Sequence, residues 1–514
     1  MKKKIFTWFL LSVCLPGLIY SQSVSKEELF ENIRSYVNSN KLNILSEFVE
    51  LLTIPNVSSD RNNIRKNANF VKQMMERRGI SVKIIETAGN PVVYGELKRP
   101  EAEKTIMFYV HYDGQPVSPD DWIDSAPFNP VIRPGILIPG SNMPKPIPYP
   151  NTNDEIEDNW RIYARSSSDD KTPIIALLSA IDALKQAGLK IKHNLKFIFE
   201  GEEEAGSVNL KQFFEENTDL LKSDVLFLCD GPAYFNNKPA VSFGVRGITS
   251  IEITVYGPNT SLHSGHYGNW APNPALKLVK LLSSMKDEEG KVLVEGFYDT
   301  VIPLSETEKK AVRSVPNFDN ELKERLGFSG TEGGGRSLIE MLQFPSLNIR
   351  GLLSGWTGSQ ARTIIPPTAT ASIDIRLVKG NDPADMREKV IEHIKKQGYH
   401  IVSGDPDQKT RAKYANIAKV RMGGGYRAAR LSMDKPISQQ IIRNLGFYLE
   451  NEIVILPGMG GSLPLYYFYD ILKTPSIIVS IANFDNNQHQ PNENLRLGNL
   501  WKGIEMYSAI LMMK

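Results

Sequence analysis

Acidic and histidine side chains gather in a few short segments of this chain. The run at residues 197–207 contains the adjacent Glu203 and Glu204, and the turns at 110–113 and 168–171 add a histidine and further carboxylates. Oxygen and imidazole ligands brought together at strand ends are what a hydrolytic site with two metal ions needs. Two neighbouring glutamates also allow one to bind metal while the other moves protons. These segments therefore predict a hydrolase.

The segments that position these residues have the pattern of an α/β sheet. An amphipathic run at residues 173–189 predicts a helix, and apolar residues at helical spacing recur through much of 26–80. In most of these sheets ligands gather at the carboxyl ends of strands, which is where the acidic turns fall. The predicted buried parallel strands are the short apolar runs at 105–110, 195–199, 225–228 and 477–481.

A second pattern begins in the middle of the chain. Residues 250–256 and 371–377 alternate in the manner of half-solvated antiparallel strands, and helical patterns cover 274–284 and 383–397. We therefore expect residues 247–425 to form an inserted α+β domain with a sheet of its own.

This insertion divides the predicted catalytic domain into residues 24–246 and 426–514. Three glycines at 423–425 are predicted to form the hinge at which the chain returns. A proline-rich and then acidic stretch at 130–158 fits either a surface loop or a flap on the rim of the cleft.

The first residues have the layout of a secretory signal peptide. Lysines at positions 2–4 precede a short apolar stretch, and small residues follow it. An uncleaved membrane anchor is the alternative, but Pro16 and Gly17 interrupt a segment that is already short for a span. We predict a signal peptide at 1–23 and a protein secreted across the inner membrane to the periplasm, without a stable span; Cys14 gives a weak hint of a lipoprotein.

The composition of the chain limits the binding partners and disulfides that we expect. The chain has 514 residues, a net charge of +2 and no basic run with interleaved aromatic residues, so we expect no binding to nucleic acid. Removal of the predicted signal peptide leaves Cys229 as the single cysteine, and an intramolecular disulfide is then impossible. Secretion without disulfides is compatible with a bacterial periplasm.

Several motifs occur together in the order typical of a known family. With them the chain resembles the dinuclear zinc peptidases, which include carnosinase-type dipeptidases, glutamate carboxypeptidase, succinyl-diaminopimelate desuccinylase and aminoacylase. The resemblance, which is strongest to the dipeptidase branch, implies a zinc-exopeptidase-like catalytic domain with a mostly parallel central sheet and an inserted lid that dimerises. The motifs are VHYDGQP at 110–116, SSSDDKTP at 166–173, FEGEEEAGS at 199–207, LCDG at 228–231, LHSGHYG at 262–268 and NQHQPNE at 487–493.

The resemblance also implies a set of metal ligands. Asp169 would bridge two zinc ions, for which manganese or cobalt are possible substitutes. His111 and Asp230 would complete the protein ligands of one ion, and Glu204 and His489 those of the other. Each ion would then keep an open position for a shared water, as catalytic zinc requires.

Two further acidic residues receive roles from the same resemblance. Glu203 would be the general base that takes a proton from the shared water and delivers it to the leaving amine, and family spacing selects it over Glu202. Asp113 is expected to accept the second ring N–H of His111 and so to fix its tautomer. Asp170 is expected to belong to the loop or to face solvent.

Residues of the predicted lid would contact the substrate. His263 would reach the active site of the partner subunit in a homodimer and stabilise the oxyanion. Thr363 and Arg376 would hold the carboxylate of the substrate, for which a guanidinium is suited. Ser462, in a glycine turn, could offer a hydroxyl and backbone N–H groups to the same carboxylate.

One position departs from the dipeptidase pattern. Carnosinase-like dipeptidases carry arginine and then glutamate before a glycine pair, and that glutamate receives the free amine of the substrate. Here these positions are Gly458 and Met459. Either another carboxylate takes that role, such as one within 154–158, or the substrate is acylated or apolar on its N-side.

The predicted function is zinc-dependent hydrolysis of peptide bonds in dipeptides or short peptides, by an exopeptidase of the dipeptidase or carboxypeptidase type. A deacylase of N-acyl amino acids is the alternative, and Met459 leans towards it. A third hypothesis is an inactive metal- or peptide-binding protein of the cell envelope. Glu203 argues against that hypothesis, because a binding protein needs no spare carboxylate beside a ligand.

Overall fold

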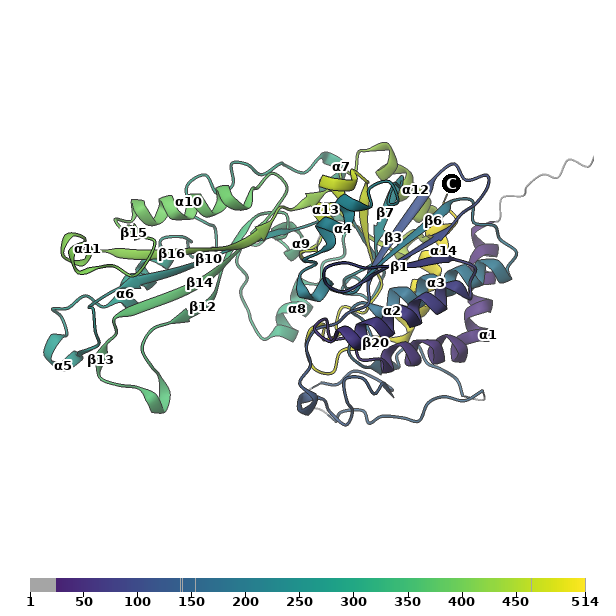
Figure 1. Ribbon diagram of the computed structural model, residues 1–514, viewed down its shortest axis with the longest axis horizontal. Coiled ribbons are helices and arrows are strands. Elements are labelled where there is room, and N and C mark those ends of the chain that lie inside the picture. The colour runs from purple at the N-terminus through teal and green to yellow at the C-terminus, as the bar shows by residue number, and fades with distance from the viewer. Residues whose placement is uncertain (1–24, 139, 141, 153, 464, 514) are drawn as a thin grey trace, which may run out of the picture.

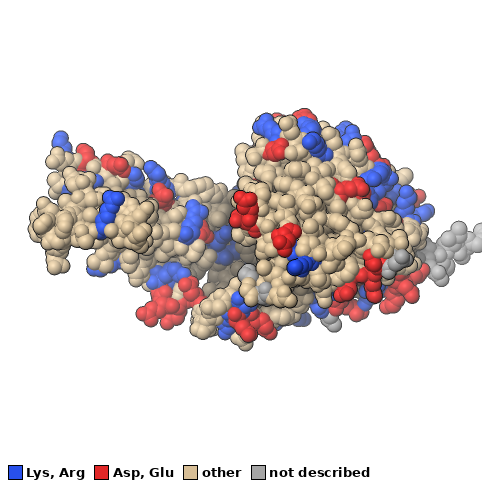
Figure 2. All heavy atoms as spheres, turned by 90° about the horizontal axis from the view of Figure 1, so that it is seen from below, with Lys and Arg blue, Asp and Glu red and all other residues tan. Residues whose placement is uncertain are grey.

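The computed structural model describes residues 25–513 apart from residues 139, 141, 153 and 464, so the predicted signal peptide at 1–23 lies outside the described residues. The chain forms two lobes (Figure 1). The large lobe is built around an eight-stranded sheet, and a narrower lobe with a five-stranded sheet, which we call the lid, projects from it. Figure 2 shows basic and acidic side chains of both signs on each lobe, with no broad field of one sign on that face.

The eight-stranded sheet has the order β1-β2-β6-β3-β7-β19-β8-β18. The neighbours β6, β3, β7 and β19 run parallel, whereas β2 is antiparallel to β6 and β8 is antiparallel to β19. The parallel centre therefore consists of the four runs predicted from the sequence, and antiparallel pairs flank it. The strands are β1 (Ser81–Ile85), β2 (Val92–Leu97), β3 (Thr105–His111), β6 (Asn194–Glu200), β7 (Val225–Leu228), β8 (Ala240–Ser242), β18 (Val454–Leu456) and β19 (Ser476–Ser480).

Helices cover both faces of this sheet. The apolar sides of α1, α3 and α14 share one core with the strands, and α4 packs with residues 465–472 on the opposite face. Helix α3 is buried around most of its circumference because it lies between the sheet and other helices. The helices of the large lobe are α1 (Lys26–Thr53), α2 (Arg61–Glu76), α3 (Lys171–Gln186), α4 (Leu210–Glu216), α12 (Pro436–Leu449), α13 (Leu465–Tyr467) and α14 (Leu497–Leu511).

A small three-stranded sheet of β4 (Val131–Arg133), β5 (Arg161–Tyr163) and β20 (Asn494–Arg496) lies beside the large one. The proline-rich stretch packs on it, since Arg133 donates to the carbonyl of Pro144 at 2.6 Å and the Tyr163 hydroxyl donates to that of Gly135 at 2.9 Å. Because β5 precedes Asp169 and β20 follows His489, this sheet brings two distant motifs together.

The lid sheet has the order β12-β14-β10-β16-β15, with α6 (Pro274–Ser283) and α10 (Pro383–Lys396) packed on one face. Its strands are β10 (Gly247–Tyr256), β12 (Ser346–Leu353), β14 (Thr368–Leu377), β15 (His400–Val402) and β16 (Ile417–Tyr426). The remaining short helices and strands are β9 (Gly244–Val245), β11 (Leu262–His263), α5 (Ser264–Tyr267), α7 (Glu306–Ser314), α8 (Asp319–Leu326), α9 (Leu338–Met341), β13 (Ile364–Ile365), α11 (Gln408–Lys413) and β17 (Ala429–Arg430).

The three glycines of the predicted hinge lie within a strand. They belong to β16, where Gly425 pairs with Thr249 of β10. A Cβ on Gly425 would lie 2.4 Å from the carbonyl oxygen of Ile248, so this glycine permits close approach of two strands. The α/β fold class, with a parallel sheet centre and an added α+β unit, is confirmed. Among the described helices, none has both the length and the apolar character to cross a bilayer.

Candidate metal centre and active site

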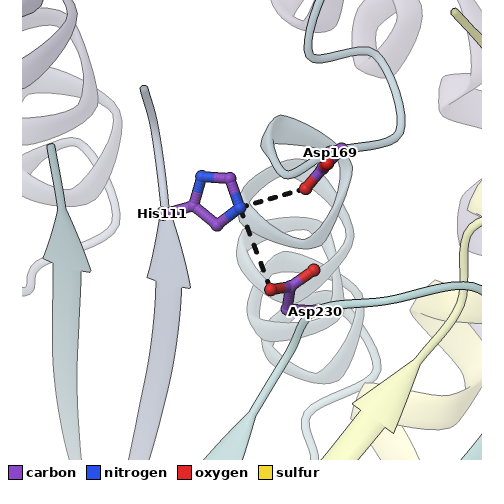
Figure 3. Close-up of side chains that lie close together, drawn as sticks. All are labelled: His111, Asp169 and Asp230. Atoms are coloured by element: carbon purple, nitrogen blue, oxygen red, sulfur yellow. Dashed lines mark hydrogen bonds and ion pairs between the residues drawn. The ribbon is translucent and has the colours of Figure 1, made fainter. Parts of the chain in front are cut away.

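His111 is the last residue of β3, in the middle of the large sheet, and is fully buried. Its Nε2 lies 3.0 Å from Asp169 Oδ1 and 3.9 Å from Asp230 Oδ2 (Figure 3). Asp230 comes two residues after β7, the strand next to β3, and Asp169 lies just before α3. The carboxyl ends of two neighbouring strands and the start of a helix thus form one group of three donors.

The second group of donors uses the other oxygen of Asp169. That Oδ2 lies 3.1 Å from His489 Nε2, which in turn lies 3.3 Å from Glu204 Oε2. In each group the potential ligand atoms lie within 4.8 Å of one another, as one metal ion requires. The structure therefore brings the five predicted ligands together and shares Asp169 between the two groups.

The turn that carries Asp169 is held by a buried carboxylate that the sequence analysis did not single out. Glu493 Oε1 accepts the backbone N–H groups of Ser168 and Asp169, both at 3.0 Å. Its Oε2 accepts the N–H of Ser166 at 3.0 Å and pairs with Arg165 at 2.7 Å. Glu493 lies at the end of the NQHQPNE motif, so the same motif supplies His489 and the support of Asp169.

Asp113 is also fully buried, and its main contacts differ from the prediction. Its carboxylate accepts the backbone N–H groups of Glu203 and Glu204, both at 3.1 Å, and a hydroxyl proton from Ser58. The Nδ1 of His111 lies 3.2 Å from the backbone carbonyl of Asp113 and 3.4 Å from its Oδ1. Asp113 thus fixes the turn with the two glutamates as well as the orientation of the imidazole.

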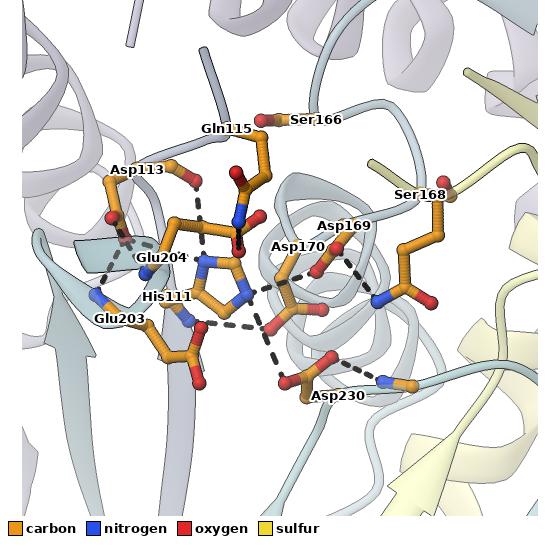
Figure 4. A network of polar contacts seen from close by, with 12 residues as sticks. His111, Asp113, Gln115, Ser166, Ser168, Asp169, Asp170, Glu203, Glu204 and Asp230 are labelled. Atoms are coloured by element: carbon orange, nitrogen blue, oxygen red, sulfur yellow. Dashed lines mark hydrogen bonds and ion pairs between the residues drawn. The ribbon is translucent and has the colours of Figure 1, made fainter. Parts of the chain in front are cut away.

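Glu203 and Glu202 differ sharply in their surroundings. Both carboxylate oxygens of Glu202 are engaged, since Oε2 accepts the N–H of Asn90 at 2.9 Å and Oε1 that of Asn209 at 2.8 Å. Glu203 instead lines the cavity beside Asp230, and Figure 4 draws it next to His111. Glu202 is therefore a structural residue, and Glu203 is the glutamate whose carboxylate faces the cavity.

The centre carries more negative charge than its protein partners compensate. Burial raises the pKa of Glu204 to about 8 and that of Asp230 to about 6, and the nearby Asp169 adds to both shifts. Burial also raises the pKa of Glu203 well above its usual value, with Asp230 and Glu204 contributing. Asp169 is the exception: burial opposes its ionisation, but hydrogen bonds from His111 and His489 lower its pKa. Crowded oxygen and nitrogen donors with excess negative charge fit divalent cations.

Asp170 lies in the turn before α3, as one of the two expectations had it, and outside both groups of donors, but it does not face solvent. It is 1% exposed, and its Oδ2 accepts the backbone N–H of His111 at 3.3 Å. Burial and the neighbouring Asp230 raise its pKa well above the usual value. The peptide bond between Asp169 and Asp170 is cis. The apolar run before His111 was the sequence signal for a buried neighbour, but it did not show that both aspartates of the turn contact this histidine.

A cavity of about 600 Å³ opens in front of the centre. It is lined by Glu203, Asp230 and His489, and also by Arg376 and Ser462, whose side chains are joined by a hydrogen bond of 2.8 Å from Arg376 Nη1 to Ser462 Oγ. Among the described residues of the 130–158 stretch, none lines this cavity, and the acidic side chains within 154–158 are exposed.

Two predicted site residues lie elsewhere. His263 and Thr363 are both exposed; His263 ends β11, and Thr363 directly precedes β13, which pairs with β11. The Thr363 carbonyl accepts the N–H of Ser264 at 3.0 Å. Figure 1 shows this region at the far tip of the lid. Thr363 therefore does not join Arg376 within one chain. His263 accepts the N–H of Gly265 at 3.0 Å through Nδ1.

Comparison with known proteins identifies the family. The profile described as Peptidase family M20/M25/M40 matches residues 107–513. The chain belongs to this family. Within it, the chain is 26% identical over 506 residues to the Cys-Gly metallodipeptidase of Schizosaccharomyces pombe, which covers 94% of this chain and 97% of the relative. It is 25% identical over 431 residues to the human Beta-Ala-His dipeptidase, covering 82% and 77%.

Solved structures of M20 relatives share the whole fold. A metallo-carboxypeptidase of the M20 family from Sulfolobus solfataricus has a TM-score of 0.71 at 30% identity and covers 91% of this chain and 98% of its own. Human carnosine dipeptidase 1 has a TM-score of 0.71 at 22% identity, covering 94% and 98%. The predicted membership in the metallopeptidase family, its dipeptidase branch and the fold are confirmed, and the reading as an inactive binding protein loses its support.

The predicted periplasmic location is wrong. The relatives that match over nearly the whole chain are Cys-Gly metallodipeptidases of yeasts, which are eukaryotes and not bacteria with a periplasm between two membranes. The prediction of a periplasmic location relied on positive charge followed by a short apolar run, which is a compositional signal that does not depend on the fold.

Proposed function

We propose that this M20 chain hydrolyses the peptide bond of dipeptides or short peptides. One observation carries the proposal: Asp169 is shared by two groups of metal-ligating side chains, and the free carboxylate of Glu203 lies beside them in one cavity. Relatives named as Cys-Gly and Beta-Ala-His dipeptidases support this substrate class.

Two zinc ions are the cofactors that we propose for this site. His111 and Asp230 would hold one, Glu204 and His489 the other, and Asp169 both. Bound there, the ions would lower the pKa of water and polarise the carbonyl of the scissile bond. Nitrogen and carboxylate donors suit zinc, and manganese or cobalt could use the same set.

Glu203 moves the proton in this proposal. Its carboxylate would accept a proton from the attacking water and deliver it to the leaving amine, which requires a group that stays unliganded within the cavity. Asp113 holds the backbone of Glu203 and Glu204, so the two side chains keep separate directions. Arg376 would bind the carboxylate of the substrate, with Ser462 positioned against its guanidinium.

We further propose a homodimer in which residues 247–425 act as lid and dimerisation domain, between catalytic parts at 24–246 and 426–514. His263 and Thr363 lie together on the tip of the lid, away from the cavity of their own chain, so a second copy is the way for them to reach a cavity. Sedimentation should give a dimer, and a fully active monomer would contradict the proposal. His263→Ala should lower kcat without a change in sedimentation.

Deacylation of N-acyl amino acids is a second candidate, because Met459 and not a carboxylate lines the cavity beside Asp230. Turnover of free dipeptides and of their N-acetyl counterparts, measured before and after removal of metal by a chelator, tests both. We expect turnover that a chelator abolishes and zinc restores. Turnover that survives complete metal removal would refute the proposed function.

A further inference from the structure

The cavity has an apolar side that the proposed function does not use. Next to the candidate metal centre it is lined by apolar side chains from four separate segments of the chain. We call this surface the apolar wall; its members are Phe235, Ile339, Leu342, Leu456, Met459 and Phe484.

The apolar wall is anchored in a core of its own. Ile339, on α9, and Leu456, on β18, are buried and pack together with Tyr234 in one hydrophobic cluster. Phe235 meets Phe484 edge to face with ring centroids 5.6 Å apart. Because the protein's own contacts hold these side chains in place, a ligand that fits the wall would have to order little of the protein.

Met459 connects the wall to the reacting groups. Its backbone N–H donates to the Gly244 carbonyl at 3.0 Å, which fixes the residue at the edge of β9. The terminal methyl group of Met459 packs against two glycines: a Cβ added to Gly231 would lie 2.9 Å from this methyl, and a Cβ added to Gly461 would lie 3.4 Å from it. Gly231 directly follows Asp230, so the thioether lies one residue from the candidate metal centre.

The charges of the cavity leave no partner for an ammonium group on this side. Among the described residues that line it, the acidic ones are Asp169, Glu203 and Asp230, all within the centre itself, and Arg376 adds a positive charge. A charged group placed against the apolar wall would lose hydration without gaining a counter-ion. An aliphatic or aromatic group placed there would lose only contact with water, which is favourable.

We propose that the apolar wall binds the acyl side of the scissile amide and selects a large, uncharged, apolar group there, without reading a free amine. The substrate class is therefore amides of amino acids that carry such a group on the acyl side, supplied by a hydrophobic N-terminal residue or by an N-acyl group. This inference rests on the proposed function, because it assumes that Arg376 holds the opposite, carboxylate end of the substrate.

A series of X-Ala dipeptides tests the side-chain preference on the zinc-loaded protein. Each methylene buried on the wall should raise kcat/KM by about fourfold, so Leu-Ala should exceed Gly-Ala by at least tenfold, while Lys-Ala and Asp-Ala should be the poorest. A flat ranking, or a preference for Lys-Ala or Asp-Ala, would overturn the inference.

A matched pair of substrates tests whether the site binds the free amine of the substrate. Leu-Ala and 4-methylpentanoyl-Ala differ only by the amino group, and their kcat/KM values should agree within about threefold. Met459→Glu should lower turnover of the des-amino compound relative to Leu-Ala by about tenfold or more, whereas Met459→Leu should keep the wild-type ratio. A wild-type ratio above about 100 in favour of Leu-Ala would overturn the inference.

These outcomes separate the inference from the function on which it rests. If the series is hydrolysed but ranked otherwise, the apolar wall does not select the substrate and the peptidase proposal stands. If neither dipeptides nor acyl amino acids are hydrolysed by metal-loaded protein, the proposed function itself fails. Should Met459→Glu not fold, the two wild-type comparisons still decide.

Discussion

Replacement of Glu493 by glutamine tests whether a buried carboxylate supports the metal centre. Glu493 is fully buried, and its two oxygens accept from three backbone N–H groups, the Ser168 hydroxyl and the Arg165 guanidinium. A glutamine keeps the shape but has one acceptor oxygen, so its NH₂ group would face N–H donors on one side. Arg165, itself 2% exposed, would lose its counter-charge.

The size of the effect follows from these contacts. Removing one partner of a buried ion pair costs about 3–5 kcal/mol, because the other charge stays buried and uncompensated. For a domain of this size such a loss lowers the melting temperature by roughly 5–10 °C. Since Ser168 and Asp169 are held by the same carboxylate, zinc affinity should also fall by about 10- to 100-fold.

The assay compares Glu493→Gln with Glu505→Gln, by thermal unfolding of metal-free protein and by zinc titration. Glu505 pairs with the largely exposed Arg34 at 2.8 Å, and such a pair is worth at most about 1 kcal/mol. The control should therefore unfold and bind zinc nearly as the wild type does. If Glu493→Gln also matched the wild type in both measurements, the argument from buried charge would be refuted.

Three further predictions concern the reacting groups. Glu203→Gln should lower kcat by about 10²- to 10⁴-fold at unchanged metal content, because it removes the proton acceptor and no ligand; undiminished turnover would exclude this role. Arg376→Met should lower kcat/KM by about 10- to 100-fold, mainly through KM, and Arg376→Lys should recover part of it; equal KM values would argue against carboxylate binding. Zinc affinity should rise from pH 5 to pH 8. Metal-free Asp230 and Glu204 have pKa values raised to about 6 and about 8, so each holds a proton below its value that zinc must displace; an affinity independent of pH would contradict these shifts.

The fold of the large lobe was predictable because its strands are short, apolar and bounded by turns. The runs at 105–110 and 225–228 became β3 and β7, and the carboxyl end of β3 and the turn after β7 carry His111 and Asp230 as expected. The mixed edges of the sheet were not predictable, since strand direction depends on the connections and not on apolar pattern. The place of the glycines at 423–425 within β16 was not predictable for a related reason: a glycine can serve a turn or a close strand contact equally well.

The candidate site was predictable as far as residue types and motif order reach. Partners that join distant segments were not visible in the sequence, as Glu493 and its contacts with the Asp169 turn illustrate. Asp170 shows the same limit, because the sequence did not reveal that both aspartates of this turn are buried against His111. Thr363 and Arg376 are only 13 positions apart in the sequence, yet the extended strand β14 separates them, so that they lie at opposite ends of the lid.

The central claim is that one aspartate serves two cations. The metal content of wild-type and Asp169→Asn protein after dialysis tests it most directly. Asp182→Asn serves as control, because Asp182 lies towards the C-terminal end of α3 and pairs with Arg78. We expect about two zinc ions per chain in the wild type and in the control, and loss of both from Asp169→Asn. Two ions retained by Asp169→Asn, or an active wild type without bound metal, would contradict it.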